Sequence, residues 1–437
     1  MQPLLATLIL IFLALLGARF SFSTERISAG PRLLFRTGIH FLLIGMALGP
    51  AGLGLLSPYA TEQLAPFLAL GLGWVGFHFG LQLDRHSLAH FPLPYHLVGI
   101  GQAVLSFALL TLAGCFAIRL LGLEGDVPMI LVLGAAATAS VSTPAGIAMV
   151  SSNFLVRGNV RDLLFFIASL DAGVGIIALQ VLYSLYRPAG VTVDLGPVPQ
   201  LALVGVAVGL GLVCGIVFLW LVRIRPAGEE LVLFLLGISA FASGAALQWG
   251  LSPLFVSVTM GAVVTNLHRD RQRVFTVLER WEKPVYLTFL LVAGALLQVP
   301  TWPVAATAVA YALLRGLVKA GSVAALVSVT PFGFDVPKRL GLGLVPQGGI
   351  SLAMAVSGVL VYSDLQIRGV DAEAALFTVV VMGVVMAELV GPFLTVSLLR
   401  RAGEIAPQVE EALAEGDHRR AEQEALHHHT PPDRLGD

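Results

Sequence analysis

Long apolar runs alternate with short polar or Pro/Gly-rich turns along the chain as far as residue 401. A helix needs about 20 mostly apolar residues to cross the hydrocarbon layer of a bilayer, and most of these runs have that length. The pattern therefore predicts an all-α polytopic membrane protein with about 13 transmembrane helices. We expect the helices at residues 2–20, 33–50, 64–83, 95–121, 127–152, 161–187, 198–222, 230–249, 251–267, 285–299, 303–329, 339–362 and 374–399.

The first apolar run, Leu4 to Leu16, could be the core of a signal peptide. It has no positive residue ahead of it and no clear small-residue cleavage site, so we interpret it as a retained first helix.

Two of the predicted helices contain clusters of residues that break helices. The fifth holds TASVSTPAG from Thr138 to Gly146, and the twelfth holds PQGGIS from Pro346 to Ser351. If six helices, one linker helix and six further helices form inverted repeats, the two breaks occupy matching positions. Because a break exposes backbone groups that need partners, it is tolerated in a membrane only beside protein or a cavity. The coincidence favours a broken-helix binding site over two ordinary proline kinks.

Composition agrees with a lipid environment. The 437 residues are 57% hydrophobic and 12% charged, about half the charge that soluble domains carry. A formal net charge of −1 gives no reason to expect nucleic acid as a partner. Cys115 and Cys214 each lie inside an apolar run, which argues against a disulfide framework or a thiolate metal site. The sequence has no zinc-protease, nucleophile-elbow or phosphate-loop motif, so we expect neither an enzyme nor a cofactor.

Positive charge is concentrated in every second predicted loop, with Arg187 and Arg368 as the exceptions. Short loops rich in lysine and arginine stay in the cytoplasm. We therefore expect a multi-pass protein of a bacterial inner membrane, with its N-terminus outside and its C-terminus in the cytoplasm. The positive residues of the odd-numbered loops are Arg26, Arg32, Arg85, Arg157, Arg223, Arg225, Arg269, Arg271, Arg273, Arg280, Lys283 and Lys338.

Residues 402–437 differ in character from the rest, with many charges and a Pro431–Pro432 pair. We expect a flexible cytoplasmic tail with a short helix at most. The run His427 to His429 could hold a metal, but adjacent histidines in a tail are usually incidental.

Asp171 is the ionisable residue that most strongly suggests a site. It lies in the middle of the sixth predicted helix, where an ionised side chain is costly and therefore informative. A carboxylate can ligate a small cation or hold a proton, so Asp171 could exchange one for the other. Alternatively, Asp171 is a structural acid locked to Lys319 or Arg315, which lie four residues apart on one face of the eleventh helix. Lys319 would then be only its counter-charge.

The remaining ionisable groups are less informative. Arg315 and Glu388, the latter on the thirteenth helix, could equally stabilise the scaffold or face a cavity. His40 and His78, on the second and third helices, are better explained as histidines that hydrogen-bond to neighbouring helices.

Several stretches, taken together, resemble a known family. They are Leu43–Pro50 (LIGMALGP), Gly71–Asp84, Leu342–Gly349 (LGLVPQGG), and Glu388–Leu394 followed by Leu399–Glu404. Each stretch is loose by itself. In this order they cover almost the whole apolar part, and the chain resembles the monovalent cation:proton antiporters, in the branch that includes the Kef-type potassium exporters.

The resemblance implies a two-part fold with two crossed discontinuous helices. Residues 1–401 would form the transmembrane domain, in which a six-helix core, near 95–187 and 303–400, moves like an elevator against a dimerising scaffold. It also implies a homodimer and an ion site where the broken helices cross.

At that site, Ser142 and Thr143 match the polar break, Asp171 matches the second acid of a family pair, and Lys319 matches a basic residue on the eleventh helix. Supporting positions are Thr138, Ser140, Gln347 and Glu388, and Arg315 is a second charge partner.

One position departs from the family pattern. The first acid of the pair, Asp or Asn in most members, is Leu170 here. Leucine binds neither a cation nor a proton, so Lys319 would pair with Asp171, and electroneutral one-for-one exchange of Na⁺ or K⁺ for H⁺ becomes easier to picture.

Two alternatives stay open. One is a transporter of the same fold that carries an organic anion, which Lys319 and Arg315 would recognise. The other is a regulated cation conduit or sensor, although the tail has no Gly-x-Gly-x-x-Gly sequence and is too short for a nucleotide-binding domain.

Overall fold

The computed structural model describes residues 38–55, 63–123, 125–188, 191, 199–223, 228–268, 271–298, 301–362, 365–367, 369–414, 417, 420, 421, 423 and 424. The first predicted helix, at 2–20, and the histidines at 427–429 lie outside these residues.

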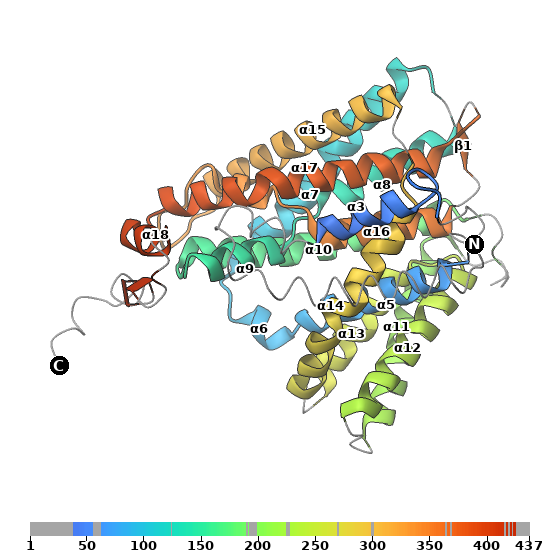
Figure 1. Ribbon diagram of the computed structural model, residues 1–437, viewed down its shortest axis with the longest axis horizontal. Helices are drawn as coiled ribbons and strands as arrows, with labels where there is room; N and C mark the ends of the chain where they lie inside the picture. The colour runs from blue at the N-terminus through green and yellow to red at the C-terminus, as the bar shows by residue number, and fades with distance from the viewer. Residues whose placement is uncertain are drawn as a thin grey trace.

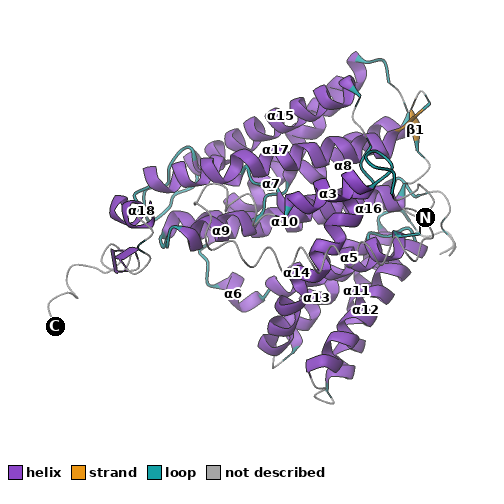
Figure 2. Ribbon diagram, viewed as in Figure 1, coloured by secondary structure: helices purple, strands orange, loops and turns teal. Residues whose placement is uncertain are grey.

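Helices make up nearly all of the described chain (Figure 2). The exception within it is a ribbon of two short antiparallel strands, β1 (Gln366–Ile367) and β2 (Val370–Asp371). The helices are α3 (Ile39–Leu48), α5 (Ala65–Gln82), α6 (Arg85–Ala89), α7 (Leu93–Leu120), α8 (Asp126–Ser140), α9 (Pro144–Asn153), α10 (Asn159–Leu185), α11 (Ala202–Val222), α12 (Gly228–Gln248), α13 (Pro253–Leu267), α14 (Arg271–Ala295), α15 (Trp302–Val329), the 3₁₀ helix η2 (Leu340–Leu344), α16 (Gly348–Val361), α17 (Ala372–Arg401) and α18 (Pro407–Ala414).

The all-α membrane fold predicted from the sequence is confirmed. Every predicted helix from 33–50 onward has a counterpart, and both predicted breaks are present, between α8 and α9 and between η2 and α16. The division at Gly250 is also present, because α12 ends at Gln248 and Gly250 adopts a positive φ of 66°. The short helix expected in the tail is α18.

The tenth predicted helix was wrong at its start. It was expected at 285–299, whereas α14 begins at Arg271 and continues through Pro284 to Ala295. The first half of α14 carries several charges, so hydropathy alone assigned it to a loop although its backbone is helical.

Seven helices of the described part are long and apolar enough to span a membrane, and three shorter apolar helices accompany them. In the most apolar windows of α7 and α15, only 17% and 22% of residues are buried inside the protein. Large apolar side chains such as Leu112 and Leu317 are exposed on these helices. Such continuous apolar surface is suited to lipid rather than water.

The described helices pack in two groups (Figure 1). One group comprises α3, α5 and α11 to α14, and the other comprises α7 to α10, η2 and α15 to α17. Within the first group α5 and α13 approach closely at Gly80 and Gly261, where an added methyl group would collide with the facing backbone. The assignment of the groups to a moving core and a dimerising scaffold stays a prediction.

The two groups meet along α10 and α16. The amide oxygen of Gln180, on α10, accepts a hydrogen bond from the backbone N–H of Ser252 at 2.9 Å, just before α13. Figure 1 shows α9 and α18 at one end of the molecule and β1 at the other. The breaks between α8 and α9 and between η2 and α16 lie between these ends, in the second group.

Candidate functional site

The two helix breaks lie against each other. The extended residues Val141 to Thr143 separate α8 from α9, and Val345 to Gln347 separate η2 from α16. The backbone N–H of Thr143 donates to the Pro346 carbonyl at 3.1 Å. The Ser142 hydroxyl donates to the Leu344 carbonyl at 2.8 Å. Each break thus satisfies part of the backbone that the other exposes, as the low dielectric of a membrane interior requires.

Gly348 allows this close crossing. Its φ is +55°, in the left-handed region that side chains rarely adopt. A β-carbon at this position would lie 2.6 Å from the side chain of Thr143. Glycine is therefore required both by the backbone conformation and by the neighbouring break.

Asp171 lies beside the crossing, on α10, and is completely buried. Its Oδ1 accepts a hydrogen bond from the backbone N–H of Ser142 at 2.9 Å. Its Oδ2 lies 2.6 Å from the Nζ of Lys319, which is also completely buried. The carboxylate is thus held between the first break and α15.

Gln102, on α7, completes the surroundings of this ion pair. Its Nε2 donates to Asp171 Oδ2 at 3.2 Å, and its Oε1 accepts from Lys319 Nζ at 3.3 Å. The sequence interpretation missed this residue. The sequence did indicate it, because Gln102 lies in the middle of the otherwise strongly apolar segment Leu93–Leu120, where an amide needs hydrogen-bond partners.

Arg315 donates hydrogen bonds to backbone carbonyls at both breaks. Its guanidinium donates to the carbonyls of Ala139 at 3.0 Å and Val141 at 2.7 Å, at the first break. At the second break it donates to the carbonyl of Val345 at 2.6 Å, with a longer contact of 3.5 Å to that of Leu344. A cation at these positions also complements the negative end of each interrupted helix.

Tyr311, a second residue that the sequence interpretation missed, precedes Arg315 and Lys319 by one and two helical turns on the same face of α15. Its hydroxyl accepts a hydrogen bond from Gln347 at 2.9 Å and lies 3.2 Å from the Thr138 hydroxyl. The Gln347 amide also donates to the Thr138 carbonyl at 3.0 Å. In the sequence, its spacing of four residues from Arg315 indicated that it lies on the same helix face.

Glu388 is placed at the start of α16. Its Oε1 accepts a hydrogen bond from the backbone N–H of Gly348 at 2.8 Å, and the side chain is 4% exposed. A carboxylate is favourable at a helix N-terminus, where N–H groups lack partners within the helix.

The four buried charges at the crossing balance formally. Arg315 and Lys319 supply two positive charges, and Asp171 and Glu388 supply two negative ones. A buried constellation of net zero charge is far less costly in a membrane than an uncompensated ion.

The other residues singled out from the sequence lie as follows. The Ser140 hydroxyl donates to the carbonyl of Ala137 within α8 at 2.8 Å. Leu170 packs against an apolar cluster around α10, close to Gly99. His40 and His78 belong to α3 and α5, in the other group of helices, and the His78 ring contacts Phe275 at 5.8 Å between centroids.

Within the described residues there is no group of three or more His, Cys, Asp or Glu side chains that could hold a resident metal ion. The site instead offers the buried carboxylates of Asp171 and Glu388 among hydroxyl, amide and backbone oxygen atoms. Such oxygen ligands suit a hard cation.

Comparison with known proteins agrees with this picture. Residues 5–401 match the family described as "Sodium/hydrogen exchanger, transmembrane". No curated protein matches the chain.

Two solved structures of the sodium proton antiporter MjNhaP1 from Methanocaldococcus jannaschii resemble it. The structure at pH 8 is 16% identical, with a TM-score of 0.65, and the match covers 91% of this chain and 100% of that one. The structure from an electron-microscopy map is 17% identical, with a TM-score of 0.63, and the match covers 93% and 100%. At these identities the likeness shows a shared fold.

Proposed function

The chain belongs to the sodium/hydrogen exchanger family, and on this premise we propose that it exchanges a monovalent cation, Na⁺ or K⁺, for H⁺ through Asp171. Family membership places it among transporters and not among enzymes, and agrees with the resemblance to monovalent cation:proton antiporters. The observation that carries the proposal is the position of Asp171, completely buried at the crossing of two broken helices and paired with Lys319.

The Asp171–Lys319 pair holds the exchangeable proton. In this structure the Lys319 ammonium neutralises the carboxylate at 2.6 Å. A Na⁺ or K⁺ ion that reaches the carboxylate takes over this role, and two positive charges beside one carboxylate repel each other. One proton therefore leaves the pair for each cation that binds. When the cation departs, a proton returns.

This scheme makes the exchange electroneutral. Leu170 offers no second acid beside Asp171, so the site exchanges one positive charge for one. An electrogenic cycle would need a further group whose proton leaves with the first.

Elevator-like movement of the helix group that bears the site would expose it to each side in turn. Support comes from the packing: both breaks, Asp171, Lys319 and Arg315 belong to the group formed by α7 to α10, η2 and α15 to α17. The site can therefore move as a unit against the other group.

We further propose a homodimer in a bacterial inner membrane, with the N-terminus outside and the C-terminus in the cytoplasm. The distribution of arginine and lysine among the loops supports this orientation. Labelling of single cysteines placed in the tail and in alternate loops tests the orientation, and the molar mass in detergent tests the dimer.

The contacts of the basic residues argue against the organic-anion alternative. Arg315 donates to backbone carbonyls of both breaks, and Lys319 donates to Asp171 and Gln102. An anion would have to displace these partners. The conduit or sensor alternative gains no support from a particular contact.

Exchange in inverted membrane vesicles tests the proposal. Addition of Na⁺ or K⁺ should collapse a preformed pH gradient, and Asp171→Asn should abolish the response. Asp162→Asn is the matched control, because Asp162 lies on the same helix with its side chain 47% exposed. Normal exchange by the Asp171→Asn protein would overturn the proposal. Substrate-stimulated uptake of an organic anion, with no response to Na⁺, K⁺ or Li⁺, would favour the alternative.

A further inference from the structure

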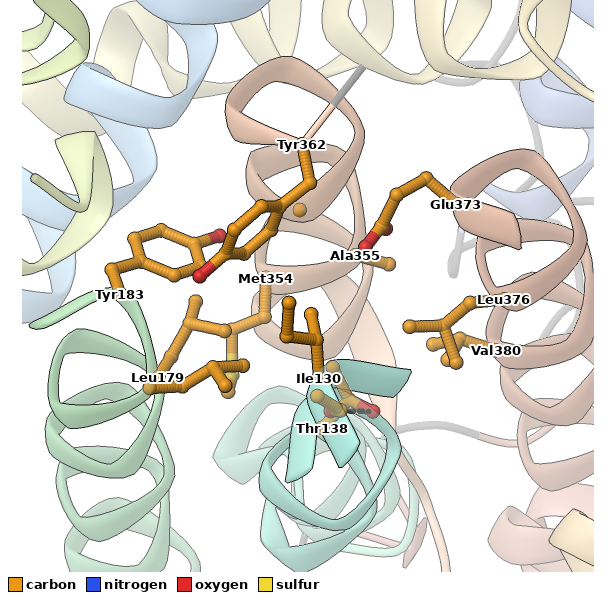
Figure 3. Close-up of a pocket in the computed structure, with 13 residues that line it drawn as sticks. Ile130, Thr138, Leu179, Tyr183, Met354, Ala355, Tyr362, Glu373, Leu376 and Val380 are labelled. Atoms are coloured by element: carbon orange, nitrogen blue, oxygen red, sulfur yellow. Dashed lines mark hydrogen bonds between the residues drawn. The ribbon is translucent and has the colours of Figure 1, made fainter. Parts of the chain in front are cut away.

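A buried carboxylate that belongs neither to the ion pair nor to the crossing of the broken helices lines a cavity. Glu373 is near the start of α17 and is 3% exposed. It lines a small cavity between α8, α10, α16 and α17. Figure 3 shows the Glu373 carboxylate directed into this space, toward Ala355.

The cavity is lined both by residues near one end of the molecule and by a residue at the crossing of the broken helices. Glu373 follows the β1–β2 ribbon directly, at the end opposite α18. Thr138 lines the same cavity at its inner side (Figure 3). Its carbonyl accepts hydrogen bonds from Gln347 at 3.0 Å and from Ser351 at 3.2 Å, so it belongs to the crossing itself.

The tyrosine hydroxyls near Glu373 donate their hydrogen bonds to other acceptors. The Tyr183 hydroxyl donates to Ser357 at 3.1 Å, and the Tyr362 hydroxyl donates to the Tyr186 carbonyl at 2.6 Å. Among the described residues, no hydrogen bond reaches the Glu373 carboxylate. Tyr183, Tyr362 and Asp371 are the titratable groups there that interact with it electrostatically, and Asp371 has the same sign of charge.

Among the residues that the structure describes, neither a hydrogen bond nor an opposite charge compensates an ionised carboxylate at this position. Burial without a hydrogen-bond partner or opposite charge is costly for an ion, so the group takes up a positive charge from outside. A metal ion needs several oxygen ligands, whereas most of the cavity lining is aliphatic, from residues such as Leu179, Leu376 and Val380. A proton needs only the carboxylate.

We infer that Glu373 is a second protonation site, which takes protons from the water at the α17 N-terminal side and passes them through the cavity toward the broken helices. An O–H bond forms at the Glu373 carboxylate as hydronium gives up its proton, and the bond breaks when water in the cavity accepts that proton. This transport role rests on the proposed cation/proton exchange, whereas protonation of Glu373 does not.

Exchange by Glu373→Gln in proteoliposomes tests the role. The amide resembles the neutral acid in shape but does not release or take up a proton in this pH range. We expect cation exchange to persist, with its half-maximal pH on the α17 N-terminal side displaced by at least about one pH unit and the pH dependence on the opposite side unchanged. Glu373→Asp should retain the wild-type profile, as should Glu229→Gln, which changes an exposed acid on α12. A wild-type profile in Glu373→Gln would overturn the inference.

Thermal unfolding as a function of pH tests protonation without transport. A proton held by buried Glu373 in the folded protein is lost as the pH rises and leaves a buried charge, so wild type should lose stability relative to Glu373→Gln. Parallel pH curves for the two proteins would overturn the inference. If wild type moves no protons in response to cations but the unfolding curves diverge, the proposed exchange fails and the protonation site stands.

Discussion

Lys319 Nζ lies 2.6 Å from Asp171 Oδ2, and both side chains are fully shielded from solvent. The two charges come from α15 and α10, and Gln102 on α7 bonds to both. Three helices are thus joined at one point, next to the crossing of the two breaks.

Replacing Lys319 by methionine should destabilise the protein strongly at neutral pH. The substitution leaves the Asp171 charge buried without its partner, and breaking a buried pair in this way costs about 3–5 kcal/mol. Thermal unfolding in detergent measures the effect. Lys338→Met, at an exposed position, is the control. The double variant Asp171→Asn/Lys319→Met should recover most of the loss, and a single Lys319→Met variant as stable as wild type would contradict the pairing.

Replacing Arg315 by lysine should weaken the crossing although the charge is kept. A single ammonium cannot reach carbonyls of both breaks as the planar guanidinium does. Each lost hydrogen bond from a charged donor costs about 1.5–3 kcal/mol, so we expect a lower unfolding temperature and weaker cation binding. Arg400→Lys, which changes an exposed arginine paired with Glu410, should behave as wild type. Equal unfolding temperatures for Arg315→Lys and wild type would show that the carbonyl contacts are dispensable.

Glu404 links the end of α17 to the start of α10, the helix that carries Asp171. Its carboxylate accepts hydrogen bonds from the backbone N–H groups of Val160 at 2.7 Å and Arg161 at 2.9 Å. Burial raises the pKa of the Glu404 carboxyl above its usual value, although these two N–H groups act in the opposite direction. The residue therefore caps α10 from a distant part of the chain.

Two variants test this cap. Glu404→Ala should lower the free energy of unfolding by about 1 kcal/mol, the typical value of an N-cap. With a raised pKa, the stabilising contribution is complete below the usual glutamate pKa of about 4.3 and declines as the pH rises through the folded-state value. Wild type should therefore lose stability relative to Glu404→Gln over that window. Glu411→Gln, at an exposed position, should show no such trend, and an opposite slope would exclude the raised pKa.

Transport should carry no net charge. Leu170 packs among apolar side chains and leaves Asp171 as the acid at its position on α10. On a solid-supported membrane, Na⁺, K⁺ or Li⁺ jumps at several pH values should give no sustained charge displacement, although a pH dye reports proton movement in the same preparation. Charge displacement that scales with proton movement would show that a second proton travels in each cycle.

The sequence predicted the helices well because lipid imposes length and apolarity on each spanning segment. It failed for the first half of α14, where charged residues from Arg271 to Lys283 form a helix that hydropathy cannot distinguish from a loop. The breaks at Ser142 and Gln347 could be anticipated because proline, glycine and clustered hydroxyls are costly in a helix interior.

The candidate site could be predicted only in part. Asp171 and Lys319 stood out because charges are rare in apolar helices. Gln102 did not, since an uncharged amide gives a weaker signal. The contacts of Arg315 with both breaks depend on the crossing in three dimensions, which residue spacing does not report. Residue spacing also could not show that Glu373 has no hydrogen-bond partner among the described residues. That depends on where the tyrosine hydroxyls of other helices point.

Proton release on cation binding tests the central claim most directly. Calorimetric titration of the purified protein with Na⁺ and with K⁺, in buffers of different ionisation enthalpy, gives the number of protons released per cation bound. We predict about one for the wild type, following the charge balance at the pair, the same for Asp162→Asn, and no cation binding by Asp171→Asn. Cation binding without proton release, or unchanged binding and release in Asp171→Asn, would contradict the account.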